Sequence, residues 1–170
     1  MPKNLVLIGF MGTGKSSVGK VLGRKLSRPV IDVDQMIETQ ESRRIDAIFE
    51  ADGEAAFRLL EKQAIAEAAK NDGAVITTGG GAVLDPENLR ALRANGWILA
   101  LTATPDTIYR RVKDSRHRPL LKHPDVLGEI ARLLETRKAL YDDADYRFET
   151  DGRNPSQVAR MILDTLKGKL

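Results

Sequence analysis

The sequence lacks several features that would assign it to a special class of protein. It has no cysteine, so disulfide bonds and thiol chemistry are excluded. No apolar run approaches the roughly 20 residues that a membrane-spanning helix needs. The 27 basic and 24 acidic residues leave a net charge of only +3, and no basic face studded with aromatic residues is evident. We therefore expect a cytoplasmic protein that binds small anionic molecules and has neither a nucleic-acid nor a membrane partner.

The pattern of apolar residues predicts one α/β domain over residues 1–170. A chain of 170 residues, 42% of them hydrophobic, can bury one proper core. Short apolar runs alternate with longer amphipathic ones, which is typical of βα units around a mostly parallel sheet. Strands are expected at 5–8, 29–32, 74–77, 97–101 and 146–149. Helices are expected at 15–26, 35–40, 45–51, 54–70, 86–94, 105–113, 125–141 and 155–166.

Three of these helices begin with a proline behind a residue that can cap the helix. The pairs are Asp85-Pro86, Thr104-Pro105 and Asn154-Pro155. Proline suits the first helical position because its missing N–H would have no partner there, and the preceding side chain can accept a hydrogen bond from the first turn. The pairs therefore predict where these helices start.

The most specific pattern follows the first expected strand. Residues 9–16 read GFMGTGKS, which fits G-x-x-x-x-G-K-[ST], and a helical pattern begins at once. The glycines let the chain curl tightly, so that several amide groups can point at the same phosphate oxygens. Lys15 would add a positive charge for the β- and γ-phosphates, and the Ser16 hydroxyl is the expected direct ligand of Mg²⁺. The pattern predicts a P-loop that binds a nucleoside triphosphate.

Two carboxylates follow the second expected strand. Ligands of a parallel sheet collect at the carboxyl ends of its strands. The alternation of an extended segment predicts that Asp32 and Asp34 lie on the same side. One of them could join the Mg²⁺ shell through water while the other accepts the proton of an acceptor hydroxyl. Alternatively, Asp34 caps the helix expected from Gln35.

A triple glycine and two arginines are further candidates. The glycines at 79–81 follow the third strand and indicate either a close approach to a ligand or a flexible turn. Arg137 lies on the apolar face of its expected helix, where a guanidinium needs an anionic partner. Arg58 either forms an internal ion pair with Glu61 or Asp34, or it binds a substrate carboxylate. In the second case Arg58 and Arg137 would grip that carboxylate together.

The segment at 113–124 is basic, rich in helix breakers and without periodicity. It is either a solvated loop or a mobile lid that carries an arginine to the transferred γ-phosphate. Arg118 is the arginine that we favour, and Arg116 is the alternative. We interpret His117 and His123 as surface residues of this segment and not as metal ligands.

Together these motifs resemble the shikimate kinases, small P-loop proteins of the nucleoside-monophosphate-kinase-like group. The resemblance covers nearly the whole chain, although the family more often has threonine where this chain has Val33. It implies a three-layer αβα fold with a central five-stranded parallel sheet, a substrate-binding region at about 33–61 and a lid at about 113–124. The matching segments are GFMGTGKSSVG at 9–19, DVD at 32–34, IFEADGEAAFRLLE at 48–61, TGGGAV at 78–83, RPLL at 118–121 and RKALY at 137–141.

The resemblance also implies an activity and a set of site residues. The reaction would be transfer of the γ-phosphoryl group of ATP to the 3-hydroxyl of shikimate, on the route to chorismate and the aromatic amino acids. Mg²⁺ would be the cofactor, and we expect a monomer. The implied catalytic residues are Lys15, Asp34 and Arg118, and Asp32 would reach Mg²⁺ through water. The implied ATP site comprises Gly12, Thr13, Gly14, Lys15, Ser16, Ser17, Arg110, Arg118, Arg153, Asn154 and Pro155. The implied shikimate site comprises Asp34, Arg58, Gly79, Gly80, Gly81 and Arg137.

Other functions are open at this point. A gluconate kinase or a nucleoside monophosphate kinase would also use a P-loop and arginines. A module that binds ATP without turnover is disfavoured by the paired aspartates. An RNA-binding protein is disfavoured because the basic residues are not interleaved with aromatic ones.

Overall fold

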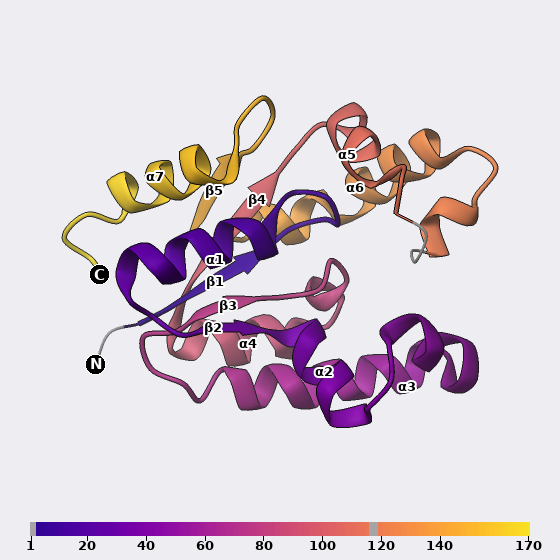
Figure 1. Ribbon diagram of the computed structural model, residues 1–170, viewed down its shortest axis with the longest axis horizontal. Coiled ribbons are helices and arrows are strands. Elements are labelled where there is room, and N and C mark those ends of the chain that lie inside the picture. Colours follow the sequence, from indigo (N-terminus) through magenta and orange to yellow (C-terminus); the bar gives the residue numbers. More distant parts are fainter. Residues whose placement is uncertain (1–2, 116–118) are drawn as a thin grey trace.

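Five parallel strands form one sheet in the order β2-β3-β1-β4-β5. This computed structural model describes residues 3–115 and 119–170, and in it β1 lies at the centre of the sheet (Figure 1). The predicted parallel sheet is therefore confirmed. The strands are β1 (Asn4–Ile8), β2 (Val30–Asp32), β3 (Val75–Thr77), β4 (Gly96–Thr102) and β5 (Tyr146–Glu149).

Helices connect the strands and cover both faces of the sheet. Most bounds lie within one or two residues of those expected, and two short 3₁₀ helices, Ala82–Leu84 and Pro119–Lys122, are additional. The helices expected at 45–51 and 54–70 form one element with a kink at Gly53, where φ is 85° and ψ is 172°. The helices are α1 (Lys15–Leu26), α2 (Val33–Glu41), α3 (Ile45–Ala68), α4 (Pro86–Ala94), α5 (Pro105–Val112), α6 (Val126–Asp142) and α7 (Pro155–Thr165).

The central strand shows how the three layers are held together. Along β1, Leu5 and Leu7 belong to the core cluster formed with α1 and α7. The alternate residues Val6 and Ile8 belong to a second cluster, formed mainly with α3, α4 and α6. All four side chains are fully buried, as expected for a parallel sheet covered on both faces. The central strand therefore contributes side chains to the cores on both faces of the sheet.

The proline-based helix starts are confirmed by their caps. The side chains of Asp85, Thr104 and Asn154 each accept a hydrogen bond from a backbone N–H in the first turn of α4, α5 and α7. Asn154 and Gln157 complete a reciprocal capping box at α7. In each case the residue after the cap is the predicted proline.

The sheet brings three candidate segments to one edge. The P-loop follows β1, Asp32 ends β2, and the glycine turn follows β3. Thr77, the last residue of β3, is level with Leu7 of β1 on one side and with Asp32 of β2 on the other. Sequence segments far apart in the chain therefore meet at the carboxyl edge. Within the described residues, no helix has the length and apolar character that crossing a membrane requires.

Candidate functional site

The P-loop is shaped by its glycines. Gly9, Gly12 and Gly14 have φ angles of 147°, 77° and 94°, which residues with a Cβ rarely adopt. Lys15 begins α1 and is buried, and its Nζ donates to the carbonyl oxygens of Gly9 at 2.7 Å and Phe10 at 2.9 Å. The expected loop, with its lysine folded over it at the start of a helix, is thus present.

Asp32 is fixed by three hydrogen bonds. Its Oδ2 accepts from the hydroxyl of Ser16 at 2.9 Å and from that of Thr77 at 3.0 Å, and its Oδ1 accepts from the backbone N–H of Gln35 at 3.1 Å. The alternative that Asp34 caps the following helix is therefore wrong, since α2 begins at Val33 with Asp32 as its cap. The prediction placed both aspartates on one side of an extended strand. In the structure Asp32 ends the strand and Asp34 lies in the first turn of α2.

One carboxylate oxygen of Asp34, Oδ1, is buried without a hydrogen-bond partner in the described part of the chain. Burial, with the nearby charges of Asp32 and Glu61, raises the pKa of Asp34 from 3.8 to about 6. A Cβ added to Gly79 would lie 2.9 Å from this Oδ1 and 3.1 Å from Oε2 of Glu61. The absence of a side chain at Gly79 leaves room for both carboxylates.

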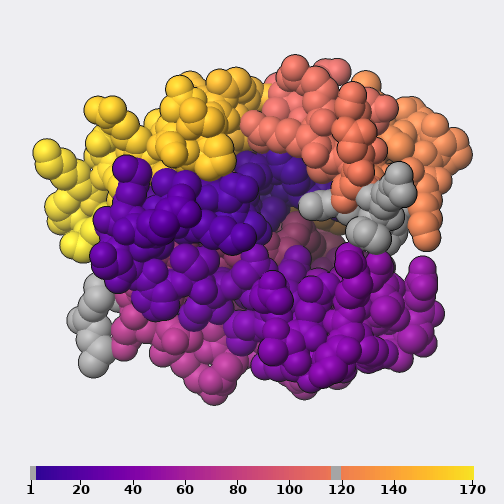
Figure 2. Space-filling view, viewed as in Figure 1, coloured from indigo at the N-terminus to yellow at the C-terminus, as the bar shows by residue number. Residues whose placement is uncertain are grey.

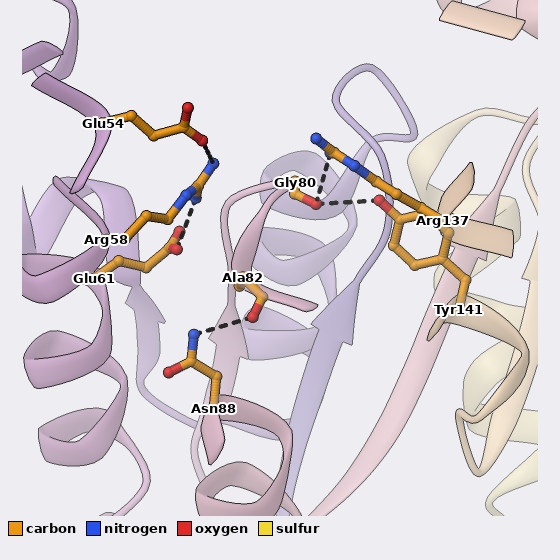
Figure 3. Close-up of polar contacts among 8 residues, drawn as sticks. All are labelled: Glu54, Arg58, Glu61, Gly80, Ala82, Asn88, Arg137 and Tyr141. Carbon is orange, nitrogen blue, oxygen red and sulfur yellow. Dashed lines mark hydrogen bonds and ion pairs between the residues drawn. The ribbon is translucent and has the colours of Figure 1, made fainter. Parts of the chain in front are cut away.

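Arg58 forms the internal ion pair that was one of its two predicted roles. Its Nη1 lies 2.8 Å from Oε1 of Glu61, which is fully buried, and its Nη2 lies 3.4 Å from Oε1 of Glu54 (Figure 3). Burial raises the pKa of Glu61, and Arg58 opposes that rise. The ion pair leaves the guanidinium at the cleft wall, so internal pairing and ligand binding are compatible.

The turn formed by Gly79, Gly80 and Gly81 has all three carbonyl oxygens paired, while its amides donate to no group of the described residues. The carbonyl oxygens of Gly79 and Gly81 accept from Ala82 N and Leu84 N at 3.2 and 3.0 Å. The Gly80 carbonyl oxygen accepts from the Tyr141 hydroxyl at 3.1 Å. In the part of the chain that the structure describes, the N–H groups of residues 79–81 donate no hydrogen bond. Three glycines that line the cleft therefore carry unused donors.

Arg137 lies on the other side of this turn. Its Nη1 donates to the Gly80 carbonyl oxygen at 3.4 Å, and its guanidinium lies 5.6 Å from the centre of the Phe10 ring. Figure 3 shows Arg58 and Arg137 on opposite sides of Gly80. No carboxylate of residues 3–115 or 119–170 forms an ion pair with Arg137. The two arginines flank the turn but do not meet in the structure.

Asp34, Arg58 and the glycines at 79–81 line a cleft of about 500 Å³. Arg137, which contacts this turn from α6, is not among the residues that line the cleft. Figure 2 shows the surface hollowed where the indigo P-loop segment, the purple α2–α3 region and the salmon α5 region meet. Met11, Phe49 and Phe57 supply apolar walls, and the rings of Phe49 and Phe57 lie 4.6 Å apart. Arg58, Asp34 and the glycine turn supply the polar wall. Such a cleft suits a small molecule with an apolar ring and several polar substituents.

A second cavity, of about 210 Å³, lies beside the P-loop and the first turn of α1. It is lined by Thr13, Gly14, Ser17, Arg111, Thr150, Arg153, Pro155 and Val158. These include five residues predicted for the ATP site. Other residues predicted for the ATP site do not line this cavity, namely Gly12, Lys15, Ser16, Asn154 and Arg110. Arg110 donates to the Thr107 hydroxyl at 3.1 Å.

Arg111, the neighbour of Arg110, lines this cavity together with Arg153 and was not predicted from the sequence. Its Nη1 donates to the Gly12 carbonyl oxygen at 3.0 Å, and its Nη2 donates to the Thr150 carbonyl oxygen at 2.8 Å. The helical period contains the signal, because Arg111 follows the buried residues Thr107 and Ile108 by four and three positions. Arg110 falls outside that face.

The lid arginines lie outside the described residues. The structure does not describe Arg116, His117 or Arg118. That Arg118, and not Arg116, reaches the γ-phosphate therefore stays a prediction. His123 is exposed, and its Nδ1 interacts with the backbone of Asp125. No cluster of three or more metal-ligating side chains occurs in the described segments.

Comparisons with known proteins agree on one family. The family model described as shikimate kinase matches residues 11–167. A shikimate kinase of Caldicellulosiruptor saccharolyticus is 44% identical over 161 residues, which is 95% of this chain and 94% of that protein. The structure of a shikimate kinase from Acinetobacter baumannii in complex with shikimate is 32% identical with a TM-score of 0.94, covering 98% of this chain and 93% of that one. A gluconokinase from Sinorhizobium meliloti, at 18% identity and a TM-score of 0.62 with 97% and 91% coverage, shares the fold alone.

The raised pKa of Asp34 leads us to expect a pH-dependent loss of stability. Because the folded protein binds the Asp34 proton more tightly than the unfolded chain, the free energy of unfolding falls as pH rises from 3.8 to about 6, and the penalty is complete above that window. Asp34→Asn removes the ionisable group and should raise the free energy of unfolding by about 2 kcal/mol at pH 8, with a much smaller gain at pH 4.5. Urea denaturation without nucleotide measures both values.

The matched control is Asp164→Asn. Asp164 is largely exposed in a 3.8 Å pair with Arg160, so this change should leave stability nearly the same at both pH values. The raised pKa would be contradicted if Asp34→Asn increased the free energy of unfolding equally at pH 4.5 and pH 8, or gave no increase at pH 8.

Proposed function

The chain belongs to the shikimate kinase family, and we propose that it transfers the γ-phosphoryl group of ATP to the 3-hydroxyl of shikimate. The products are ADP and shikimate 3-phosphate, on the route to chorismate and the aromatic amino acids. One observation carries the assignment of the site. A carboxylate, an arginine and a row of free backbone amides line a single cleft that also reaches the P-loop residue Ser16.

The acceptor binds in this cleft through its carboxylate and hydroxyls. The free amides of Gly80 and Gly81 and the guanidinium of Arg58 are neighbouring donors, which suits a planar carboxylate. Arg137 joins them by leaving the Gly80 carbonyl oxygen, its long hydrogen bond there being weak. The apolar walls contact the ring of the acceptor.

Asp34 accepts the proton of the attacking hydroxyl. Its pKa of about 6 leaves it ionised at neutral pH and yet basic enough to take a proton as the new bond forms. The free Oδ1 is available to a hydroxyl because no residue of the described protein competes for it. Phosphoryl transfer depends chiefly on alignment and charge, so Asp34 also contributes by orienting the acceptor.

On the donor side, the P-loop holds the phosphates of ATP. Lys15 exchanges its two loop carbonyls for the β- and γ-phosphates, and Arg118 reaches the γ-phosphate from the lid. The cavity that includes Arg153 and Pro155 receives the adenine. Arg111 belongs to this adenine site by its position.

Ser16 and Asp32 fit a magnesium ion. Both offer hard oxygen donors, and Oγ of Ser16 lies 2.9 Å from Oδ2 of Asp32. Both residues adjoin the loop that would hold the phosphates. One carboxylate and one hydroxyl are few ligands, which is usual for Mg²⁺ that is also bound by substrate phosphates and water. When bound, Mg²⁺ neutralises charge that develops on the phosphates. Asp32, held by Thr77 and by the start of α2, would bind the ion through water.

The chain is proposed to act as a monomer, as a single domain, in the cytoplasm. Both halves of the cleft come from one chain, so no second copy is needed to complete it. The two core clusters share the central strand, which supports one domain over the whole length.

The proposed function is tested by release of ADP from purified protein with Mg²⁺ and ATP, offered shikimate, gluconate or AMP separately. Shikimate alone should support turnover, and a chelator should abolish it. Lys15→Met should lose the activity, whereas Lys20→Met, an exposed lysine of the same helix, should keep it. Release of ADP with gluconate or AMP, and none with shikimate, would overturn the proposal.

The role of Asp34 is tested by its effect on turnover. Asp34→Asn should keep ATP binding and lower kcat at least about 100-fold, because an amide cannot accept the proton. Steady-state kinetics with saturating shikimate measures the loss, and Asp164→Asn serves as the control. A kcat near that of the wild type would remove Asp34 from catalysis.

A further inference from the structure

The peptide between Gly80 and Gly81 presents its carbonyl oxygen to one side of the turn and its N–H to the other. All peptide bonds of the described residues are trans, so the carbonyl of Gly80 and the N–H of Gly81 point in opposite directions. The carbonyl points toward α6, where it accepts from Tyr141. The N–H of Gly81 therefore points away from α6, toward the side on which Figure 3 places Arg58.

Arg58 lies close against Gly81. A Cβ added to Gly81 would be 2.6 Å from Nη1 of Arg58, so the guanidinium occupies the space that a side chain would need. The Gly81 amide and the Arg58 guanidinium are consequently adjacent donors on one side of the turn. A rotation of the Gly80–Gly81 peptide would remove the amide from this pair.

Two side chains of α6 donate to the Gly80 carbonyl oxygen, and they differ in hydrogen-bond length and in burial. Arg137 donates at 3.4 Å and Tyr141 at 3.1 Å, one helical turn further on. Tyr141 is 5% exposed and belongs to the main core cluster, so its phenol is held in place by packing. Burial raises the pKa of Tyr141, so the phenol stays protonated and able to donate. Arg137 therefore makes the longer hydrogen bond, and Tyr141 is the partner that packing holds in place.

We propose that Tyr141 is a positioning residue for the acceptor: its hydroxyl holds the Gly80 carbonyl, fixes the Gly81 N–H toward the acceptor carboxylate and leaves Arg137 free to bind that carboxylate. The inference rests on the proposed function. Without the phenol, Arg137 is the remaining side-chain donor to this carbonyl. Its move to the acceptor would then leave the carbonyl without a side-chain partner, and that loss opposes binding.

Tyr141→Phe tests the proposal, because it removes one hydroxyl and keeps the buried ring. The Kd and KM for shikimate should rise about tenfold, the typical effect of leaving a polar group unpaired. The KM for ATP and the kcat should stay within about twofold, since uniform binding is lost without a change in the chemical step. Tyr146→Phe, a tyrosine whose hydroxyl accepts from Lys169 away from the cleft, is the matched control and should leave both KM values unchanged.

Calorimetric titration of shikimate in the presence of Mg-ADP, below the Tm of each variant, distinguishes the outcomes. A wild-type protein that binds no shikimate would overturn the proposed function and this inference together. A wild type that binds shikimate, with an equal Kd in Tyr141→Phe, would overturn the inference alone. A lower Tm with equal rises in the KM for ATP and for shikimate would also overturn it, because that result indicates a structural role only.

Discussion

The acceptor half of the cleft depends on a stretch of backbone that carries no side chains. At Gly79 a Cβ would press on the carboxylates of Asp34 and Glu61, and at Gly81 it would press on the guanidinium of Arg58. Because these positions are empty, groups from α2 and α3 can approach the same turn from one side while α6 holds it from the other. The carboxyl edge of the sheet then brings this turn beside the P-loop, so that the proposed donor and acceptor halves of the site meet.

The same site contains buried polar atoms that form no hydrogen bond within the described chain. Oδ1 of Asp34, Oε2 of Glu61 and Nε of Arg58 are buried without a hydrogen-bond partner in the described chain. Unpaired buried groups destabilise a folded protein, and three of the five such side-chain atoms in the described chain lie at this site. The raised pKa of Asp34 and its proposed role as a base have the same cause, which is burial beside other carboxylates. Stability and activity are thus expected to oppose each other at this residue.

Much of this organisation could be predicted from the sequence, where local chemistry decides the outcome. The P-loop glycines and the proline starts of three helices depend only on nearby residues, and both were predicted correctly. The geometry at Asp32 could not be predicted, since a tertiary contact with Thr77 and an early helix start replaced the strand alternation. Arg111 was missed because the sequence motif does not distinguish it from the adjacent Arg110. On the helix the two side chains point in different directions, and Arg111 is the one that reaches the P-loop.

The central claim is that arginines beside the glycine turn bind the acceptor through its carboxylate. The direct measurement is the affinity for shikimate and for its methyl ester, by calorimetry with Mg-ADP, in the wild type and in Arg137→Ala. Arg137 is suited to this cycle because its removal leaves no carboxylate of the described residues unpaired. In the wild type the ester should bind about 100-fold more weakly than shikimate, given the strength of charge-assisted hydrogen bonds, and in Arg137→Ala this ratio should fall clearly. An ester penalty of the same size in both proteins would contradict the account.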